Sequence, residues 1–361
     1  MKDFQGEVSG GDPGALNIAV SPSGNFYGSE QTLLTYLEHT KLGFLLFVPS
    51  NSCEELTQRA KALPNVSLHT FHSPVGLSVK ISWLILKCWT KKMNINVYLN
   101  EAGLIRYINR LPRLGKLHKV VHVRLTEDVK LRPWHEVNKN GMTVLSTSSF
   151  VANELKKIGV ESEVLSSPFR SLGMESAHAG FFDRRLIVVS RLSQGKGLKW
   201  YKSFCEFLES QRMSIRIDHY GRVDESEKEF LEFVHSLKFV KWNSRGFESD
   251  KTAIFKEGTL LHLNPVEPLG VVLMEAINHG VPYLAFDNGG TGEISKNLGL
   301  DDFSVDCAAI NWEETMLAKW QGFANADETR DRLNKAKRIL EKSYSPDEYS
   351  KVLDKKLMRT T

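Results

Sequence analysis

The sequence has few cysteines and no long apolar run, and these absences exclude several classes of protein. Its four cysteines are Cys53, Cys88, Cys205 and Cys307. Their spacing fits neither a zinc site nor a disulfide framework, so we expect reduced thiols in a cytoplasmic protein. The nearest candidate for a membrane span, residues 81–89, is shorter than the about 20 residues needed and contains a lysine. The polar amino-terminal residues lack the apolar core of a secretory signal.

Charge of neither sign dominates the chain, because the net charge is only +4. The distribution is uneven, however, and residues 80–139 carry many more lysines and arginines than acids. Such a region favours an anionic partner, although a solvated basic face gives the same pattern. No nucleic-acid-binding module accompanies the charge, which argues against DNA or RNA. Residues 81–89 with their flanking lysines fit either a buried helix or a peripheral contact with the cytoplasmic face of a membrane.

Short apolar runs alternate with longer helical patterns along most of the chain. The predicted strands are residues 16–20, 43–48, 66–71, 95–99, 119–123, 142–146, 186–190, 214–220, 259–264 and 281–286. Continuous apolar strands separated by helices predict parallel sheets covered by helices on both faces. Ser149 is predicted to cap the helix that follows the sixth run. A break at residues 344–346 divides the charged, helical carboxyl-terminal stretch.

A small, polar, glycine-containing segment, residues 166–180, has the composition of a linker. It predicts an amino-terminal domain of residues 1–170 and a second domain of residues 171–330. Both read as doubly wound α/β units of the Rossmann type. Ligands in such sheets bind at the carboxyl ends of the strands, so a pair of these units predicts a central cleft.

Two carboxylates surround an apolar helix in the second half. Glu267 follows a buried strand, Pro268 suits the first turn of a helix, and Glu275 lies on that helix. The free backbone N–H groups at the helix start favour an anion, and carboxylates accept hydrogen bonds from hydroxyl groups. Together they fit a phosphorylated sugar compound. The alternative is a capping role for Glu267 and a salt bridge for Glu275.

Two cations precede this region, at the end of an earlier strand. Arg191 emerges from that strand, and Lys196 follows in a loop between two glycines. Cations at this edge of a sheet can neutralise a diphosphate and help it leave. A basic surface loop is the alternative.

These segments resemble the retaining nucleotide-sugar glycosyltransferases of the GT-B fold, specifically glycosyltransferase family 4. The family's R-L-x-x-x-K-G pattern is matched at residues 191–197, and its E-x7-E signature by Glu267 and Glu275. The G-x-P and G-G-x-x-E patterns follow at residues 280–282 and 289–293. The resemblance is clear in the second half and fainter in the first. It implies a GT-B architecture whose carboxyl-terminal helices, residues 331–361, cross back to the amino-terminal domain.

The resemblance also implies a role for each matched residue. Arg191 and Lys196 would bind the donor diphosphate, Glu267 the hydroxyls of the donor sugar, and Glu275 the ribose. The remaining donor-binding positions would contact the phosphates and the sugar mainly through the backbone. They are Leu269, Gly270, Val271, Gly290 and Thr291.

The first half offers two weaker matches to the family. Gly28 and Ser29 stand in its Gly-Gly-x-Glu loop, with a serine in place of the second glycine. The dinucleotide fingerprint G-x-G-x-x-G is absent, which argues against a dehydrogenase. The family's cleft histidine falls on the strand ending KVVHVR, where either His122 or Arg124 fits. Both positions point to the same side of a strand.

The expected activity is transfer of a sugar, with retention of its anomeric configuration, from a UDP-, GDP- or ADP-sugar to a hydroxyl. The acceptor would be a saccharide or a lipid-linked saccharide. No Asp-x-Asp metal motif lies in a suitable loop, so we expect no metal and no cofactor. The alternatives are a GT-B epimerase of nucleotide sugars and a non-catalytic GT-B scaffold.

Overall fold

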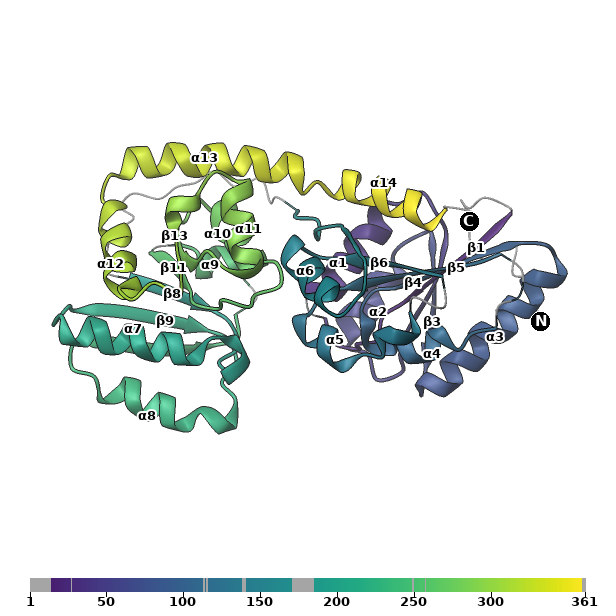
Figure 1. Ribbon diagram of the computed structural model, residues 1–361, viewed down its shortest axis with the longest axis horizontal. Coiled ribbons are helices and arrows are strands. Elements are labelled where there is room, and N and C mark those ends of the chain that lie inside the picture. The colour runs from purple at the N-terminus through teal and green to yellow at the C-terminus, as the bar shows by residue number, and fades with distance from the viewer. Residues whose placement is uncertain are drawn as a thin grey trace. The chain divides into compact units, whose positions relative to one another are not determined.

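The computed structural model describes residues 14–26, 28–112, 114, 116–137, 141–170, 185–248, 250–256 and 258–358. The chain divides into two compact units. The first comprises the residues up to Pro168 together with those from Tyr344 onward, and the second runs from Phe169 to Ser343. Figure 1 shows both units, with labels on many of their helices and strands.

The first unit is built around a parallel sheet of seven strands in the order β3-β2-β1-β4-β5-β6-β7. The strands are β1 (Ala15–Val20), β2 (Phe44–Pro49), β3 (Val66–Phe71), β4 (Asn94–Leu99), β5 (Leu117–Val123), β6 (Met142–Ser146) and β7 (Glu163–Val164). The helices are α1 (Gly28–His39), α2 (Glu54–Lys61), α3 (Pro74–Thr90), α4 (Ile105–Asn109), α5 (Thr126–Leu131), α6 (Ser149–Lys157) and α14 (Pro346–Leu357). Short 3₁₀ turns occupy Ala102–Leu104 and Trp134–Glu136.

Apolar residues on both faces of the central strands explain why this sheet is covered on both sides. On β1, Ile18 and Val20 belong to one buried cluster with α3 and α4, while Ala19 belongs to another with α1 and α14. Alternate side chains of a strand point to opposite faces. A strand whose neighbouring residues are all apolar therefore needs a helix layer on each face.

The second unit contains a parallel sheet of six strands in the order β10-β9-β8-β11-β12-β13. The strands are β8 (Arg185–Val189), β9 (Ile215–Tyr220), β10 (Val240–Gly246), β11 (Thr259–His262), β12 (Tyr283–Phe286) and β13 (Ser304–Val305). The helices are α7 (Leu198–Ser210), α8 (Lys228–Ser236), α9 (Lys251–Ile254), α10 (Val271–Asn278), α11 (Gly289–Asn297), α12 (Trp312–Gly322) and α13 (Ala326–Ser343). The 3₁₀ turns are Gln194–Lys196, Glu225–Glu227 and Asp301–Phe303.

The predicted fold class of parallel-sheet α/β units is confirmed, and all ten predicted strands are present within two residues at each end. Three strands were not predicted. β7 and β13 have two residues each, and β10 reads VKWNSRG, in which polar residues interrupt the apolar pattern. The cap predicted at Ser149 is wrong by one position, because the side chain of Ser148 accepts the hydrogen bond from Val151 N.

The carboxyl-terminal helices divide between the two units. α13 packs against α10 in the second unit, whereas α14 packs against α1, β4 and β5 in the first. Pro346 begins α14, as the break at residues 344–346 indicated. Among the described residues, no helix is long and apolar enough to span a bilayer.

Polar contacts as well as apolar ones fix α14 on the first unit. Asp354 Oδ1 accepts hydrogen bonds from Tyr36 Oη and Thr40 Oγ1, both at 2.7 Å. Leu353 and Leu357 are buried in the cluster that includes Tyr36. The final helix therefore completes the core of the amino-terminal sheet although it lies more than 300 residues later in sequence.

We predict that Leu353→Ala lowers the free energy of unfolding by about 2–5 kcal/mol, because it leaves a cavity between α14 and α1. Val352 is exposed on the same helix, so Val352→Ala should change that free energy by less than about 0.5 kcal/mol. Urea unfolding of both variants measures the difference. Equal effects of the two substitutions would contradict the packing of α14.

Candidate functional site

The loops after β8 and β11 bring together two of the predicted site residues in the second unit. Lys196 ends the 3₁₀ turn that follows β8, and Glu267 lies in the loop between β11 and α10. Lys196 Nζ lies 3.3 Å from Glu267 Oε2. Both side chains are partly accessible, with 36% of Lys196 and 19% of Glu267 exposed. An ion pair thus stands at the carboxyl edge of a parallel sheet, where ligands of such sheets bind.

Two further residues surround the Glu267 carboxylate. Asn264 Nδ2 donates to Glu267 Oε2 at 2.8 Å, and His262 Nε2 lies 3.7 Å from the same oxygen. Burial raises the pKa of Glu267, but Lys196, His262 and the Asn264 bond together bring that pKa below its ordinary value. Burial lowers the pKa of His262, which keeps its ring neutral near pH 7. All three contacts reach Oε2 rather than Oε1.

A glycine allows the close approach of these two loops. Gly197 has a left-handed backbone conformation with φ of 82°. A Cβ atom at this position would lie 1.9 Å from the carbonyl oxygen of Leu263. Any other residue would push the 3₁₀ turn away from the end of β11. Gly197 therefore fixes Lys196 beside Glu267.

The start of α10 packs against the start of α11. Gly270 caps α10 and lies against the Thr291 side chain, while Leu269 is buried and Val271 is exposed. Gly290 N donates to Glu267 O at 2.7 Å, and a Cβ on Gly290 would lie 2.3 Å from the Pro268 carbonyl oxygen. Leu269, Gly270, Gly290 and Thr291 thus pack together beside the Glu267 backbone.

Arg191 and Glu275 have other partners. Arg191 is 65% exposed, and its Nε donates to Asp224 Oδ1 at 2.7 Å. Glu275 pairs with Lys251, whose Nζ lies 3.0 Å from Oε2. Both residues come from the expected elements, and each forms an ion pair with a residue other than Lys196 or Glu267. The salt bridge of Glu275 is the alternative that its sequence position left open, and a donor would have to compete with both partners.

In the first unit, the loop after β1 leads to a buried carboxylate. Ser29 Oγ donates to Glu30 Oε2 at 2.8 Å, and Ser21 Oγ donates to Glu30 Oε1 at 3.0 Å. Burial and the charge of Glu101 raise the pKa of Glu30 despite these hydroxyl bonds. Gly28 begins α1, and a Cβ there would meet no neighbouring atom. The Ser29 hydroxyl therefore bonds to a side chain of the same unit, that of Glu30, and the space beside Gly28 is open.

His122 and Arg124 lie in one buried network. Arg124 Nη2 donates to the hydroxyls of Tyr98 and Tyr349 at 3.1 and 3.2 Å. His122 Nδ1 lies 3.3 and 3.4 Å from the same two oxygens. Arg124 also donates to the Asn100 carbonyl and to Ser167 Oγ. The two residues proposed for one position thus share two tyrosines.

His122 and Arg124 differ in charge although both are buried. Burial is the main cause that lowers the pKa of His122 well below its ordinary range, and the charge of Arg124 adds to the effect. His122 is therefore neutral near pH 7, whereas Arg124 is charged. The hydrogen bonds of Arg124 go to carbonyl, amide and hydroxyl oxygens rather than to a carboxylate.

Several site residues were not predicted. Asn264 had a usable signal, because an asparagine before a proline favours a turn in which its side chain accepts backbone bonds, and Val266 N donates to Asn264 Oδ1. His262 lies within the strand and looks like a core residue. Asp224 and Lys251 come from other elements, and no spacing connects them with Arg191 and Glu275.

Comparison with solved structures identifies the fold. HepE from Anabaena in complex with UDP-glucose gives a TM-score of 0.72 at 15% identity, covering 95% of this chain and 99% of that one. The lipopolysaccharide outer core galactosyltransferase WaaB gives 0.67 at 13% identity, with coverage of 95% and 98%. A Staphylococcus aureus TarM variant in complex with UDP gives 0.69 at 9%, with coverage of 96% and 100%. The chain has the two Rossmann-like units of these GT-B structures.

Sequence comparison covers less of the chain. A sucrose synthase from Melioribacter roseus is 30% identical over 193 residues, which are 46% of this chain and 24% of that protein. The chain thus spans about a quarter of the length of this relative. No family model matches the sequence.

We predict that Lys196→Met lowers the free energy of unfolding, and that the size of this decrease depends on pH. A carboxylate with a depressed pKa stabilises the fold above its unfolded pKa, about 4.3, and this stabilisation is lost as the pH falls through the folded value. Removing the lysine charge while burial remains raises the pKa of Glu267. The deficit of the variant in unfolding free energy should therefore be largest near pH 7 and shrink toward pH about 4.

Urea unfolding across this pH range measures the deficit. Lys199→Met, three residues along the chain, is the matched control and should show a difference that does not vary with pH. A deficit of Lys196→Met that is constant across the range would contradict the coupling of Lys196 to Glu267.

We also predict that Gly290→Ala destabilises the second unit by about 1–3 kcal/mol, because the new methyl group would overlap the Pro268 backbone. Gly322 lies at the end of α12, and a Cβ there would meet no atom. Gly322→Ala should therefore be neutral or slightly stabilising. Thermal unfolding of the two variants measures the difference, and an unchanged midpoint for Gly290→Ala would contradict the close packing of the two loops.

Proposed function

We propose that this protein is a retaining glycosyltransferase of family 4 type, which moves a sugar from a nucleotide sugar to an acceptor hydroxyl without a metal. The observation that carries the proposal is the Lys196–Glu267 pair, held by Gly197 at the carboxyl edge of the second sheet. The GT-B fold supports it, as do the complexes of HepE with UDP-glucose and of TarM with UDP. The matched segment of the sucrose synthase agrees with a nucleotide-sugar substrate.

The charges around this pair suit a diphosphate and a sugar together. Lys196 supplies a cation that can leave Glu267 for a phosphate oxygen, and Arg191 is a second, more exposed cation. The N–H groups at the start of α10 favour negative charge. Glu267 Oε1 can accept hydrogen bonds from sugar hydroxyls. Glu275, once released from Lys251, would accept those of the ribose.

The proposed reaction breaks the bond between the anomeric carbon and the diphosphate oxygen. A bond from the acceptor oxygen to the same carbon forms on the same face, which retains the configuration. The acceptor proton passes to the departing phosphate oxygen, so the products are a glycoside and a nucleoside diphosphate. Lys196 and Arg191 stabilise the negative charge that develops on the leaving group. Glu267 orients the sugar and forms no covalent intermediate.

The first unit would supply the acceptor side of the reaction. His122 is neutral and Arg124 is charged, so the two candidates for the family's cleft position predict different chemistry. A neutral imidazole can accept a hydrogen bond from a sugar hydroxyl, whereas a guanidinium can only donate. The acceptor itself is proposed to be a saccharide or lipid-linked saccharide, in a cytoplasmic setting.

We predict that Glu267→Ala and Glu275→Ala affect different steps. Glu267→Ala should lower kcat by about 10²-fold or more while nucleotide binding is kept, because the sugar loses its orienting group. Glu275→Ala should raise the Kd of the nucleoside diphosphate by about tenfold, the cost of a lost hydrogen bond to a charged group. Thermal-shift screening of UDP-, GDP- and ADP-sugars first selects the donor.

Glu229→Ala, on the exposed surface of α8, is the matched control and should leave both constants unchanged. Calorimetry with the nucleoside diphosphate and a turnover assay separate binding from transfer. Wild-type kcat in a folded Glu267→Ala protein would overturn the proposed role. Release of a rearranged sugar without an acceptor would instead indicate an epimerase, and binding without turnover of any donor would indicate a scaffold.

A further inference from the structure

Helix α3 exposes an apolar stripe that the described residues of the first unit do not cover. Its core side is formed by Leu77, Ile81, Leu84, Ile85 and Cys88, which are buried. Five other apolar side chains of the helix are each 47–64% exposed. They are Val75, Val79, Trp83, Leu86 and Trp89. Their spacing of three or four residues places them along one side of the helix, so α3 is apolar on two separate sides.

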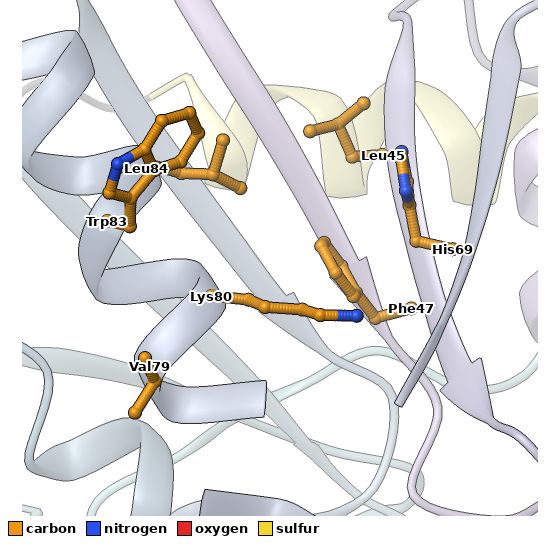
Figure 2. A pocket seen from close by; sticks show the side chains of 7 residues that line it. All are labelled: Leu45, Phe47, His69, Val79, Lys80, Trp83 and Leu84. Carbon is orange, nitrogen blue, oxygen red and sulfur yellow. The ribbon is translucent and has the colours of Figure 1, made fainter. Parts of the chain in front are cut away.

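An open pocket adjoins this stripe where α3 leaves part of the sheet uncovered. Its volume is about 350 Å³, and its lining residues are Leu45, Phe47, His69, Val79, Lys80, Trp83 and Leu84. Figure 2 shows Trp83 and Leu84 on the helix side, with Leu45, Phe47 and His69 on the strands opposite. The His69 ring stacks on Phe47 with a centroid distance of 5.2 Å. The pocket is thus an apolar groove between α3, β2 and β3.

Lysines border the stripe and the pocket on a segment that has no acids. No aspartate or glutamate occurs between Glu55 and Glu101, and α3 with the turn after it carries Lys80, Lys87, Lys91 and Lys92. Lys80 Nζ donates to Thr70 O at 2.9 Å beside the pocket, and Lys87 Nζ lies 5.3 Å from the Trp83 ring centroid. Apolar side chains that include two tryptophans, with cations alongside, suit the boundary between acyl chains and headgroups.

We propose that the α3 face docks on an anionic lipid bilayer, with the stripe in the outer part of the acyl region and the lysines on the phosphates. The groove between α3 and β2–β3 then receives part of one acyl chain. Charge complementarity selects the occupant, because a basic segment without acids favours an anionic surface over an uncharged one. The inference concerns the first unit alone and is independent of the proposed sugar transfer in the second.

Flotation of the full chain with vesicles tests the apolar part of the proposal. The protein should float with vesicles of equal parts phosphatidylglycerol and phosphatidylcholine, and not with phosphatidylcholine alone. The double variant Val79→Ser with Trp83→Ser should lose flotation. Ile310→Ser, at an exposed apolar position of the second unit, is the matched control and should float like the wild type. Failure of the wild-type chain to float with anionic vesicles would overturn the proposal.

A triple glutamine variant tests the charged part. Replacing Lys80, Lys87 and Lys91 should abolish flotation, whereas the same change at three exposed lysines of the second unit should not. These control positions are Lys228, Lys238 and Lys241. Equal losses in the two triple variants would indicate a general charge effect and overturn the assignment to α3.

Two further measurements examine the insertion itself. The fluorescence of Trp83 is the difference between the emission of the wild type and that of Trp83→Phe. Phospholipids brominated on the acyl chain should quench this fluorescence, and lack of quenching would overturn the placement of the stripe. Monomeric dihexanoyl phosphatidylglycerol serves as a soluble amphiphile. Binding of this monomer without binding of vesicles would show a lipid-ligand pocket and overturn docking on a bilayer.

Discussion

The ion pair between Lys196 and Glu267 organises the candidate site of the second unit. It joins the end of β8 to the end of β11, and it requires the two loops to touch at Gly197. The same loop carries the backbone carbonyl that accepts from Gly290 at the start of α11. Glu267 therefore connects three βα junctions of the sheet, two through its carboxylate and the third through its backbone carbonyl. A charge pair in a partly accessible position is also one that a ligand can open, because a phosphate can take the place of the carboxylate beside Lys196 while water or a sugar hydroxyl bonds to Glu267.

In the first unit, the buried cation Arg124 is stabilised by neutral oxygens rather than by a carboxylate. Arg124 makes hydrogen bonds to neutral oxygens on β4, directly after β4, before the predicted linker and on α14. A buried charge without a carboxylate partner is costly unless its donors are satisfied, and here five oxygens satisfy them. Tyr349 brings α14 into this network, so the last helix of the chain completes the surroundings of both His122 and Arg124.

The sequence predicted most of the fold because the strands are short continuous apolar runs, and such runs can be buried only in a sheet covered on both faces. β10 was not predicted, because it lies at the edge of the sheet and polar residues interrupt its apolar pattern. At the site, the apolar runs were enough to place Lys196 and Glu267 after the ends of two strands, and the sheet order shows that these strands, β8 and β11, are neighbours. The sequence did not reveal that Asp224 and Lys251 hold Arg191 and Glu275, since ion pairs between distant segments leave no local pattern. His262 was missed because a histidine within an apolar strand reads as a core residue.

A structure of the chain with a nucleotide sugar bound tests the central claim most directly. The account predicts that the pyrophosphate oxygens lie about 3 Å from Lys196 Nζ and from backbone N–H groups at the start of α10. It also predicts that Glu267 faces the sugar hydroxyls with its Oε1 atom. A diphosphate bound elsewhere, with Lys196 still paired to Glu267, would contradict it.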